Sequence, residues 1–259
     1  MMMARIALFI SLITFPLMSF ATPKTWLDTS FVKRAFLEVA LKNEYSSGDK
    51  PLVKWQQPIK IWVKHKVADQ ILHDELVDAH LLHLQKITGH SISRVSTRKH
   101  ANVIWIFTRE SLWQQDISQE IGKDALKHIH GAICTASYRV SVKNKDIVRA
   151  TVIVPVDQSR AHGKLLACIV EEITQVMGLP NDSQLAYPSI FNDRTPDDLL
   201  SPLDVVLLKL LYEPSLKSGM SKSQVSDQID ILLVQYQRDG ILKNAVNVSR
   251  SAPLWKILE

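Results

Sequence analysis

Apolar residues recur at helical intervals along much of the chain. Spacings of three and four residues place them on one face of each segment, which is typical of amphipathic helices packed on a core. A Ser-Ser-Gly-Asp break at residues 46–49 ends the first such segment, and Gly89 follows the second. The predicted helices cover residues 30–45, 67–87, 110–130, 160–177, 200–212 and 221–236.

Other segments have the patterns of strands. Residues 58–65 alternate apolar and basic side chains, as in a strand with one buried face. Residues 101–108 form a nearly continuous apolar run, which is typical of a fully buried strand. Two further predicted strands, 132–142 and 147–156, flank a Lys-Asn-Lys-Asp segment whose composition predicts a hairpin turn.

This mixture of elements predicts an α+β fold. No Pro-, Gly- or Ser-rich linker divides residues 22–259, so we expect them to form a single domain with one large core. Helical spacing continues beyond the body of this domain and predicts a C-terminal helical extension over about residues 215–259. Apolar residues in its last segment, 245–259, are expected to pack onto the body or against a partner.

The first 21 residues have the pattern of a secretory signal peptide. Arg5 precedes an apolar run over residues 6–20, and Ser-Phe-Ala at residues 19–21 matches the small-x-small pattern that signal peptidase cuts. The run is shorter than the roughly 20 residues that span a bilayer and contains Pro16. We therefore predict a periplasmic or secreted product that begins at Thr22 and has no transmembrane segment.

Cys134 and Cys168 are the two cysteines of the chain. In the oxidising compartment that a signal peptide implies, such a pair most simply forms one disulfide bond. A free buried thiol and a metal ligand are the alternatives, although thiolate ligands need a reducing setting to persist. We interpret the pair as structural.

The charge balance argues against a nucleic-acid partner. The formal net charge is +5, and removal of Arg5 with the signal peptide lowers it to +4. Lysine and arginine are scattered, without the basic helix or aromatic-interleaved stripe that follows a phosphate backbone.

Residues 168–182 have the spacing of a zinc-peptidase active-site helix and turn but lack its histidines. Metzincin zinc peptidases have the frame H-E-x-x-H-x-x-G-x-x-H-D, in which three histidines hold zinc and the glutamate is the general base. Here the frame is E-E-x-x-Q-x-x-G-x-x-N-D. Its ligand positions are Glu171, Gln175 and Asn181, its base position is Glu172, its turn is Gly178, and Asp182 follows the third ligand position.

Downstream segments extend the resemblance to the matrixin branch of the metzincins. Leu185, Ala186, Tyr187 and Pro188 stand where matrixins have Leu-Met-Tyr-Pro, with alanine in place of the methionine beneath the metal. Residues 200–212 resemble the matrixin closing helix, L-S-x-x-D followed by an apolar stretch that ends in Leu-Tyr. The resemblance implies a metzincin-like, or zincin-type, mixed sheet with an active-site-like helix, and it makes Tyr187 a candidate binding residue.

Most of the mature chain also resembles the family named domain of unknown function 2927. The resemblance is based on the N-terminal helix, Trp55, both cysteines, the 168–175 helix and the segments 188–193, 211–214 and 219–220. It implies an exported bacterial protein with a peptidase-like fold and no established activity.

The altered frame does not suit zinc. One carboxylate and two neutral amides make a poor zinc cage, and without a metal Glu172 loses the polarised water that it would deprotonate. The five oxygen-bearing residues, Glu171, Glu172, Gln175, Asn181 and Asp182, suit calcium or magnesium better than zinc, but we favour a hydrogen-bonded cluster without a metal. A glycosidase-like carboxylate pair with Asp182 is a third possibility, although adjacent glutamates on a helix point in directions about 100° apart.

Other polar residues are weaker candidates for a site. One predicted helix contains three histidines and two more flank a predicted turn, and we expect such histidines to be solvated or structurally paired. Neither of two candidate serine nucleophiles sits in a Gly-x-Ser-x-Gly elbow. These residues are His73, His80, His83, His128, His130, Ser137 and Ser189.

The leading hypothesis is therefore an exported pseudoenzyme that binds a peptide or an envelope protein. Metzincin clefts take extended chains along an edge strand, which we expect within residues 147–156. The alternative is a hydrolase of a peptide or an envelope polymer that uses Glu172 with an oxygen-ligated metal. A purely structural envelope component is a third class.

Overall fold

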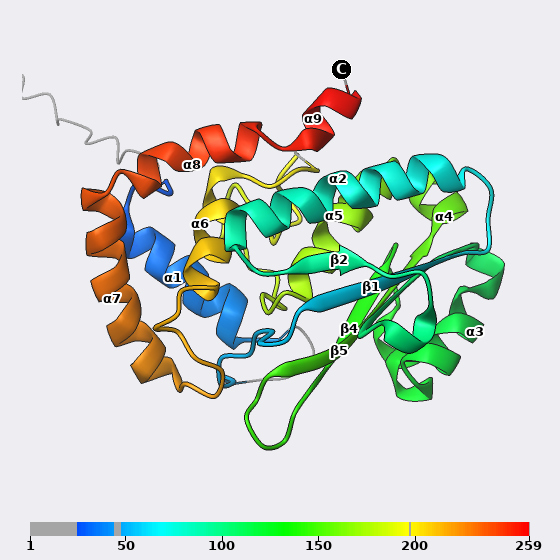
Figure 1. Cartoon of the computed structure of the whole chain (residues 1–259), viewed down its shortest axis with the longest axis horizontal. Helices are drawn as coiled ribbons and strands as arrows, with labels where there is room; N and C mark the ends of the chain where they lie inside the picture. The colour runs from blue at the N-terminus through cyan, green and yellow to red at the C-terminus, as the bar shows by residue number, and fades with distance from the viewer. Residues whose placement is uncertain (1–24, 44–47, 197, 259) are drawn as a thin grey trace, which may run out of the picture.

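The computed structural model describes residues 25–43, 48–196 and 198–258. The predicted signal peptide, residues 1–21, lies outside the described residues. Within them the fold is a mixed α/β arrangement of one five-stranded sheet with helices on both faces (Figure 1).

The sheet has the strand order β2-β1-β3-β5-β4, and most of its pairs are parallel. Among the described strands, β1 pairs in parallel with β2 and β3, β3 pairs in parallel with β5, and β4 pairs antiparallel with β5. The sheet is therefore mixed, as the sequence predicted. The strands are β1 (Ile59–His65), β2 (Ile92–Arg94), β3 (Val103–Thr108), β4 (Thr135–Val140) and β5 (Ile147–Pro155).

The expectation of an edge strand within residues 147–156 was wrong. Strand β5 lies between β3 and β4, and β4 forms the edge of the sheet. The burial of the two strands gives the physical reason. The last six residues of β5 are all buried, as in an interior strand covered on both faces, whereas no residue of β4 is fully buried.

The helices follow the predicted segments with two interruptions. The predicted helix 110–130 ends at Glu120 and continues as a short 3-10 turn, because Gly122 has a φ of 132° that no α-helix contains. The predicted helix 160–177 divides near Gly163. The helices are α1 (Thr29–Leu41), α2 (Gln70–Thr88), η1 (Arg98–His100), α3 (Glu110–Glu120), η2 (Lys123–His128), α4 (Val156–Ala161), α5 (Leu165–Gln175), α6 (Pro202–Leu211), α7 (Lys222–Arg238), α8 (Ile241–Arg250) and α9 (Pro253–Leu258).

Alternate side chains of the central strands enter two different cores. Trp105 and Phe107 of β3 pack in the main core, which also contains the buried faces of α1, α2, α5 and α6. Ile104 and Ile106 point to the other face and meet Trp113 of α3 in a smaller cluster. The continuous apolar run of β3 is thus explained by burial on both faces.

The predicted C-terminal extension packs onto the body. Helix α7 contacts α1, α8 contacts α6, and α9 contacts α2 (Figure 1). Leu254 is buried, whereas Trp255 on the same helix is partly exposed. In the part of the chain that the structure describes, no helix has the length and apolarity needed to cross a membrane.

The turn after α5 requires glycine. Gly178 has a φ of 122°, and a Cβ there would lie 2.3 Å from the carbonyl oxygen of Val53. The same turn is held by Trp55, whose Nε1 donates to the Val176 carbonyl oxygen at 2.8 Å, and by Tyr212, whose hydroxyl donates to that of Met177 at 3.0 Å. The chain can therefore reverse closely against residues 53–55.

Replacing Gly178 with alanine is expected to lower the free energy of unfolding by about 2–4 kcal/mol, because both the backbone strain and the overlap with Val53 are unfavourable. Urea unfolding followed by circular dichroism measures this loss. Gly163→Ala is the matched control: Gly163 also has a positive φ, but a Cβ at that residue would have no other atom within 4 Å. Equal losses in the two variants would show that the Val53 contact contributes nothing.

Candidate functional site

A cavity of about 500 Å³ opens between α5, β4 and the loops that follow α5. Three segments of the sequence form most of its wall, and Asn43, shortly after α1, also lines it. Residues 131–138 provide one wall, α5 and the preceding Lys164 provide the second, and residues between 180 and 198 provide the third. Four of the residues singled out from the frame line it: Glu171, Glu172, Gln175 and Asp182.

A disulfide bond joins two walls of the cavity. Cys134 lies directly before β4, Cys168 lies in the first turns of α5, and their Cα atoms are 5.9 Å apart. The predicted pairing is confirmed. Both cysteines line the cavity, so the bond holds the edge strand beside the helix that carries the glutamates.

Helix α5 presents Glu171, Glu172 and Gln175 to the cavity. Its other face buries the apolar stripe that the sequence predicted, including Ile169 and Ile173. Glu171 is partly exposed, whereas Glu172 has an exposed fraction of only 7%. Although adjacent glutamates point in different directions on a helix, both of these line the same cavity.

Gln175 links two carboxylates of the cavity. Its side-chain Nε2 donates to Asp182 Oδ1 at 3.1 Å and to Glu171 Oε1 at 3.4 Å. The amide therefore ties the last turn of α5 to the segment beyond the Gly178 turn. These two hydrogen bonds hold the Glu171 and Asp182 carboxylates against the same neutral amide group.

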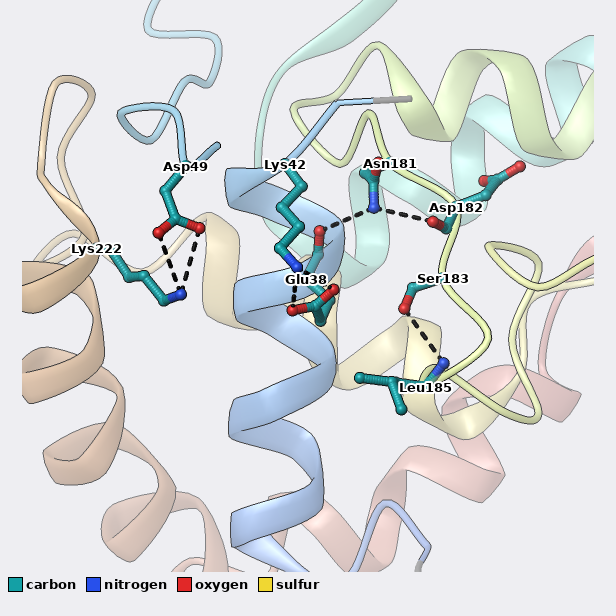
Figure 2. A network of polar contacts seen from close by, with 8 residues as sticks. All are labelled: Glu38, Lys42, Asp49, Asn181, Asp182, Ser183, Leu185 and Lys222. Atoms are coloured by element: carbon teal, nitrogen blue, oxygen red, sulfur yellow. Dashed lines mark hydrogen bonds and ion pairs between the residues drawn. The ribbon is translucent and has the colours of Figure 1, made fainter. Parts of the chain in front are cut away.

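Asn181 is turned away from the cavity, towards α1 (Figure 2). Its Nδ2 donates to the carbonyl oxygens of Glu38 at 3.2 Å and Asp182 at 2.9 Å, and its backbone N–H donates to the Val39 carbonyl oxygen. Helix α1 ends at Leu41, so Glu38 and Val39 supply carbonyls of its last turn. Asn181 thus satisfies helix-end acceptors that have no partner within the helix.

The three ligand positions of the frame do not converge on one point. The Asn181 amide is used on α1, and Gln175 directs a nitrogen donor, not an oxygen, at the carboxylates. Calcium and magnesium require oxygen lone pairs instead. Among the described residues, no group of three or more His, Cys, Asp or Glu side chains is placed to hold a metal ion. The calcium or magnesium alternative gains no support from this arrangement.

The segment around Tyr187 forms part of the third wall, but Tyr187 itself does not line the cavity. Its exposed fraction is 50%, and its peptide bond to Pro188 is cis. The next residues, Ser189 and Ile190, do line the cavity. The tyrosine therefore lies on the surface beside the site.

Asp204 anchors this wall to α6. Its carboxylate accepts hydrogen bonds from the Ser189 hydroxyl and from the backbone N–H groups of Ile190 and Ser201. Burial raises the pKa of Asp204 to about 6, and these hydrogen bonds oppose the rise. The Ser-x-x-Asp spacing of a capping box at the start of α6 is the sequence signal for this role.

Three charged residues of the cavity were missed by the sequence reasoning. Lys164 Nζ lies 3.1 Å from Asp198 Oδ1, and this ion pair joins the start of α5 to the third wall. Asp193 is an additional carboxylate of that wall. Neither part of the chain has a motif that distinguishes these residues from ordinary surface charges.

Three histidines of α2 are buried. His80 Nε2 lies 3.1 Å from both the Val170 carbonyl oxygen and Thr174 Oγ1, and His83 Nε2 lies 3.0 Å from the Val248 carbonyl oxygen. The expected structural pairing is confirmed for these two. His73 stacks on Phe107 with ring centroids 4.6 Å apart.

The remaining candidates have no shared site in the described residues. Ser137 lines the cavity on β4, and the Ser189 hydroxyl donates to Asp204. His128 and His130 do not line the cavity.

Comparison with known protein families gives one match. The family described as "Protein of unknown function (DUF2927)" matches residues 29–230, which is most of the chain and includes the whole cavity. The chain belongs to this family. The resemblance to this family that the sequence showed is therefore confirmed. A search of curated proteins found no match.

Loss of the disulfide bond is expected to lower the free energy of unfolding by about 3–4 kcal/mol, because the unfolded chain regains the freedom of the closed loop. Comparing the Cys134→Ser/Cys168→Ser variant with the wild type in urea measures this. The reduced wild type serves as the control and is expected to unfold with the double variant. A double variant as stable as the oxidised wild type would contradict the expectation.

The buried histidines are expected to make the fold sensitive to acid. Burial lowers the pKa of His80 to about 3 and that of His73 to about 4, from an ordinary 6.5. The unfolded state therefore binds more protons between pH 6.5 and these values, so stability is complete above pH 6.5 and falls as the pH decreases.

Between pH 6.5 and pH 4, the free energy of unfolding is expected to fall by about 3 kcal/mol less in His80→Gln than in the wild type. Urea unfolding at several pH values measures how steeply the free energy of unfolding changes with pH in the variant and in the wild type. His162→Gln, at an exposed position, is the control and is expected to keep the wild-type slope. Parallel pH profiles for wild type and His80→Gln would overturn this assignment.

Proposed function

We propose that this protein is an exported, catalytically inactive member of its family that binds an extended peptide strand along β4. The strand would come from a free peptide or from an envelope protein. The observation that carries the proposal is that consecutive residues of the edge strand, rather than alternate ones, line the cavity.

Successive side chains of a strand point to opposite faces of the sheet. Ala136 and Tyr138 pack on the main core, so Thr135 and Ser137 belong to the opposite face. All four residues line the cavity. A cavity that meets both faces runs along the edge of the strand, where backbone N–H and C=O groups point out of the sheet.

Among the described strands, β4 pairs with β5 alone. The outer edge of such a strand presents backbone donors and acceptors that another extended chain can pair with. Helix α5 stands on the far side of the cavity and limits what can enter. The volume of about 500 Å³ lies within the usual range for ligand sites.

The frame of α5 supports binding without catalysis. Glu172 occupies the general-base position and lines the cavity, but Asn181, at the third ligand position, is hydrogen-bonded to the end of α1 instead. A metal-activated water is therefore not provided for by these side chains. The polar face of α5 is instead suited to hydrogen bonds with a bound chain.

Two observations support a metzincin-like scaffold. The helix with the altered frame lies against the main core, and the antiparallel edge strand lies across the cavity from it. This places an edge strand opposite the frame, which is where metzincin clefts take extended chains. The disulfide bond and the apolar segment at residues 6–20 support export to the periplasm or the medium.

An equimolar pool of random-sequence decapeptides tests the proposal. Hydrogen exchange of the mature chain with the pool is expected to show slower exchange of the amides of Thr135–Val140, because a docked strand would pair with the edge of β4. Mass spectrometry of the pool is expected to show intact peptides. Exchange on α7, which contributes no residue to the cavity wall, is the internal control.

Two outcomes favour the other hypotheses. Cleavage of the pool that disappears in Glu172→Gln would establish the hydrolase, whose case is that Glu172 lines the cavity. Unchanged exchange along β4 with an intact pool would leave only a structural role in the envelope.

A further inference from the structure

A row of basic side chains crosses one end of the sheet. The register of β1, β3 and β5, extended by one residue, places Lys60, Asn102 and Arg149 side by side. The backbone N–H of Asn102 donates to the Lys60 carbonyl oxygen, and that of Ala150 donates to the Asn102 carbonyl oxygen, as this register requires. Arg139 of β4 stands directly opposite Arg149. We call Lys60, Arg149 and Arg139 the basic row.

The basic row lies on the face of the sheet that carries α3. Side chains at even spacings along a strand share one face. Trp62 and Ile153, further along β1 and β5, pack in the small cluster beneath α3. Lys60, Arg139 and Arg149 are nevertheless exposed. Helix α3 therefore leaves this end of the sheet open to a partner.

The two arginines of the row repel each other. Like charges directly opposite on neighbouring antiparallel strands are destabilising. Within the described ranges, every ion pair involves cations other than Lys60, Arg139 and Arg149. The strand pair thus keeps an unfavourable contact that a bound anion would relieve.

The loop that joins β4 to β5 lies at the same end of the sheet and projects from the body (Figure 1). The backbone N–H of Ser141 donates to the Asp146 carbonyl oxygen at 2.8 Å and closes this loop. Val142 has an exposed fraction of 89%, and Lys143 and Lys145 are exposed as well. The loop therefore presents an apolar side chain together with two further cations.

The acidic residue of this loop has partners of its own. Asn144 Nδ2 donates to Asp146 Oδ2. Burial lowers the pKa of Lys54 to about 8, and the nearby charges of Glu213 and Asp146 oppose this shift. Asp146 therefore acts on a buried cation of the core.

We propose that the basic row and the β4–β5 loop dock on a lipid bilayer that contains anionic headgroups. The phosphates of a bilayer form a plane that several cations at one end of the sheet can contact together, and the negative surface potential of anionic lipids attracts basic segments. Val142 would enter the headgroup region, where an apolar side chain gains by leaving water. A soluble acidic polymer would match the cations but would give the valine no partner. This binding is separate from that of a strand in the cavity.

Flotation with two kinds of vesicle tests the proposal, one of phosphatidylcholine alone and one of equimolar phosphatidylcholine and phosphatidylglycerol. The protein used begins at Thr22, because the apolar run over residues 6–20 would itself enter lipid. Binding to the mixed vesicles is expected to be at least about tenfold tighter than to phosphatidylcholine, and added salt is expected to weaken it. Equal binding to both kinds of vesicle, or binding to neither, would overturn the proposal.

Arg139→Gln/Arg149→Gln removes two charges from the basic row and is expected to weaken binding to the mixed vesicles at least about fivefold. Lys243→Gln/Arg250→Gln is the matched control, because it removes two charges from exposed positions of α8. The control is expected to bind as the wild type does. Thermal unfolding checks that both variants are folded. Equal losses in the two variants would show attraction by net charge alone and overturn the assignment to the basic row.

Val142→Ser distinguishes a bilayer from a soluble acidic polymer. The substitution keeps every cation, so binding to long-chain polyphosphate is expected to stay as in the wild type. Binding to the mixed vesicles is expected to weaken about threefold, because the apolar contact with the headgroup region is lost. Vesicle binding that Val142→Ser leaves unchanged, with polyphosphate bound at least as tightly as vesicles, would assign this surface to a soluble polyanion and overturn the bilayer proposal.

Discussion

The contact between the Gly178 turn and the Val53 carbonyl determines how the cavity is built. Because no side chain stands at residue 178, the chain after α5 can reverse directly against residues 53–55. The reversal brings Asp182 back to Gln175 and sends Asn181 to the last turn of α1. Without this close approach, the third wall could not lie beside α5. One backbone contact thus positions both the acidic side of the cavity and the end of the first helix.

Two buried polar groups join separate elements around the cavity. Asp204 connects α6 to the loop at Ser189 and Ile190, and His80 connects α2 to α5. Each of these groups gains hydrogen bonds that offset part of the cost of desolvation. These hydrogen bonds support the walls of the cavity from the core side, while the disulfide bond holds α5 to the segment before β4. The walls are therefore fixed by contacts outside the cavity itself.

Periodicity predicted the elements of this fold well because the core is large. Apolar stripes identified α1, α2, α5 and α6, and the two cysteines identified their own bond. The predicted edge strand was wrong, because a hairpin pattern indicates that two strands pair but does not indicate which of them has a second neighbour in the sheet. The frame of residues 171–182 found four cavity residues together with Asn181, which spacing alone cannot orient. Lys164, Asp193 and Asp198 come from loops whose positions depend on tertiary contacts.

An unpaired edge strand can promote aggregation, because it can pair with any exposed strand. In this protein the edge of β4 faces a cavity rather than open solvent, and α5 limits the space beside it. A second copy of the sheet would need room along the whole edge, whereas a single extended segment needs only the cavity. The arrangement therefore discourages pairing between sheets, and this effect depends on the separation that the Gly178 turn and the disulfide bond maintain between α5 and β4.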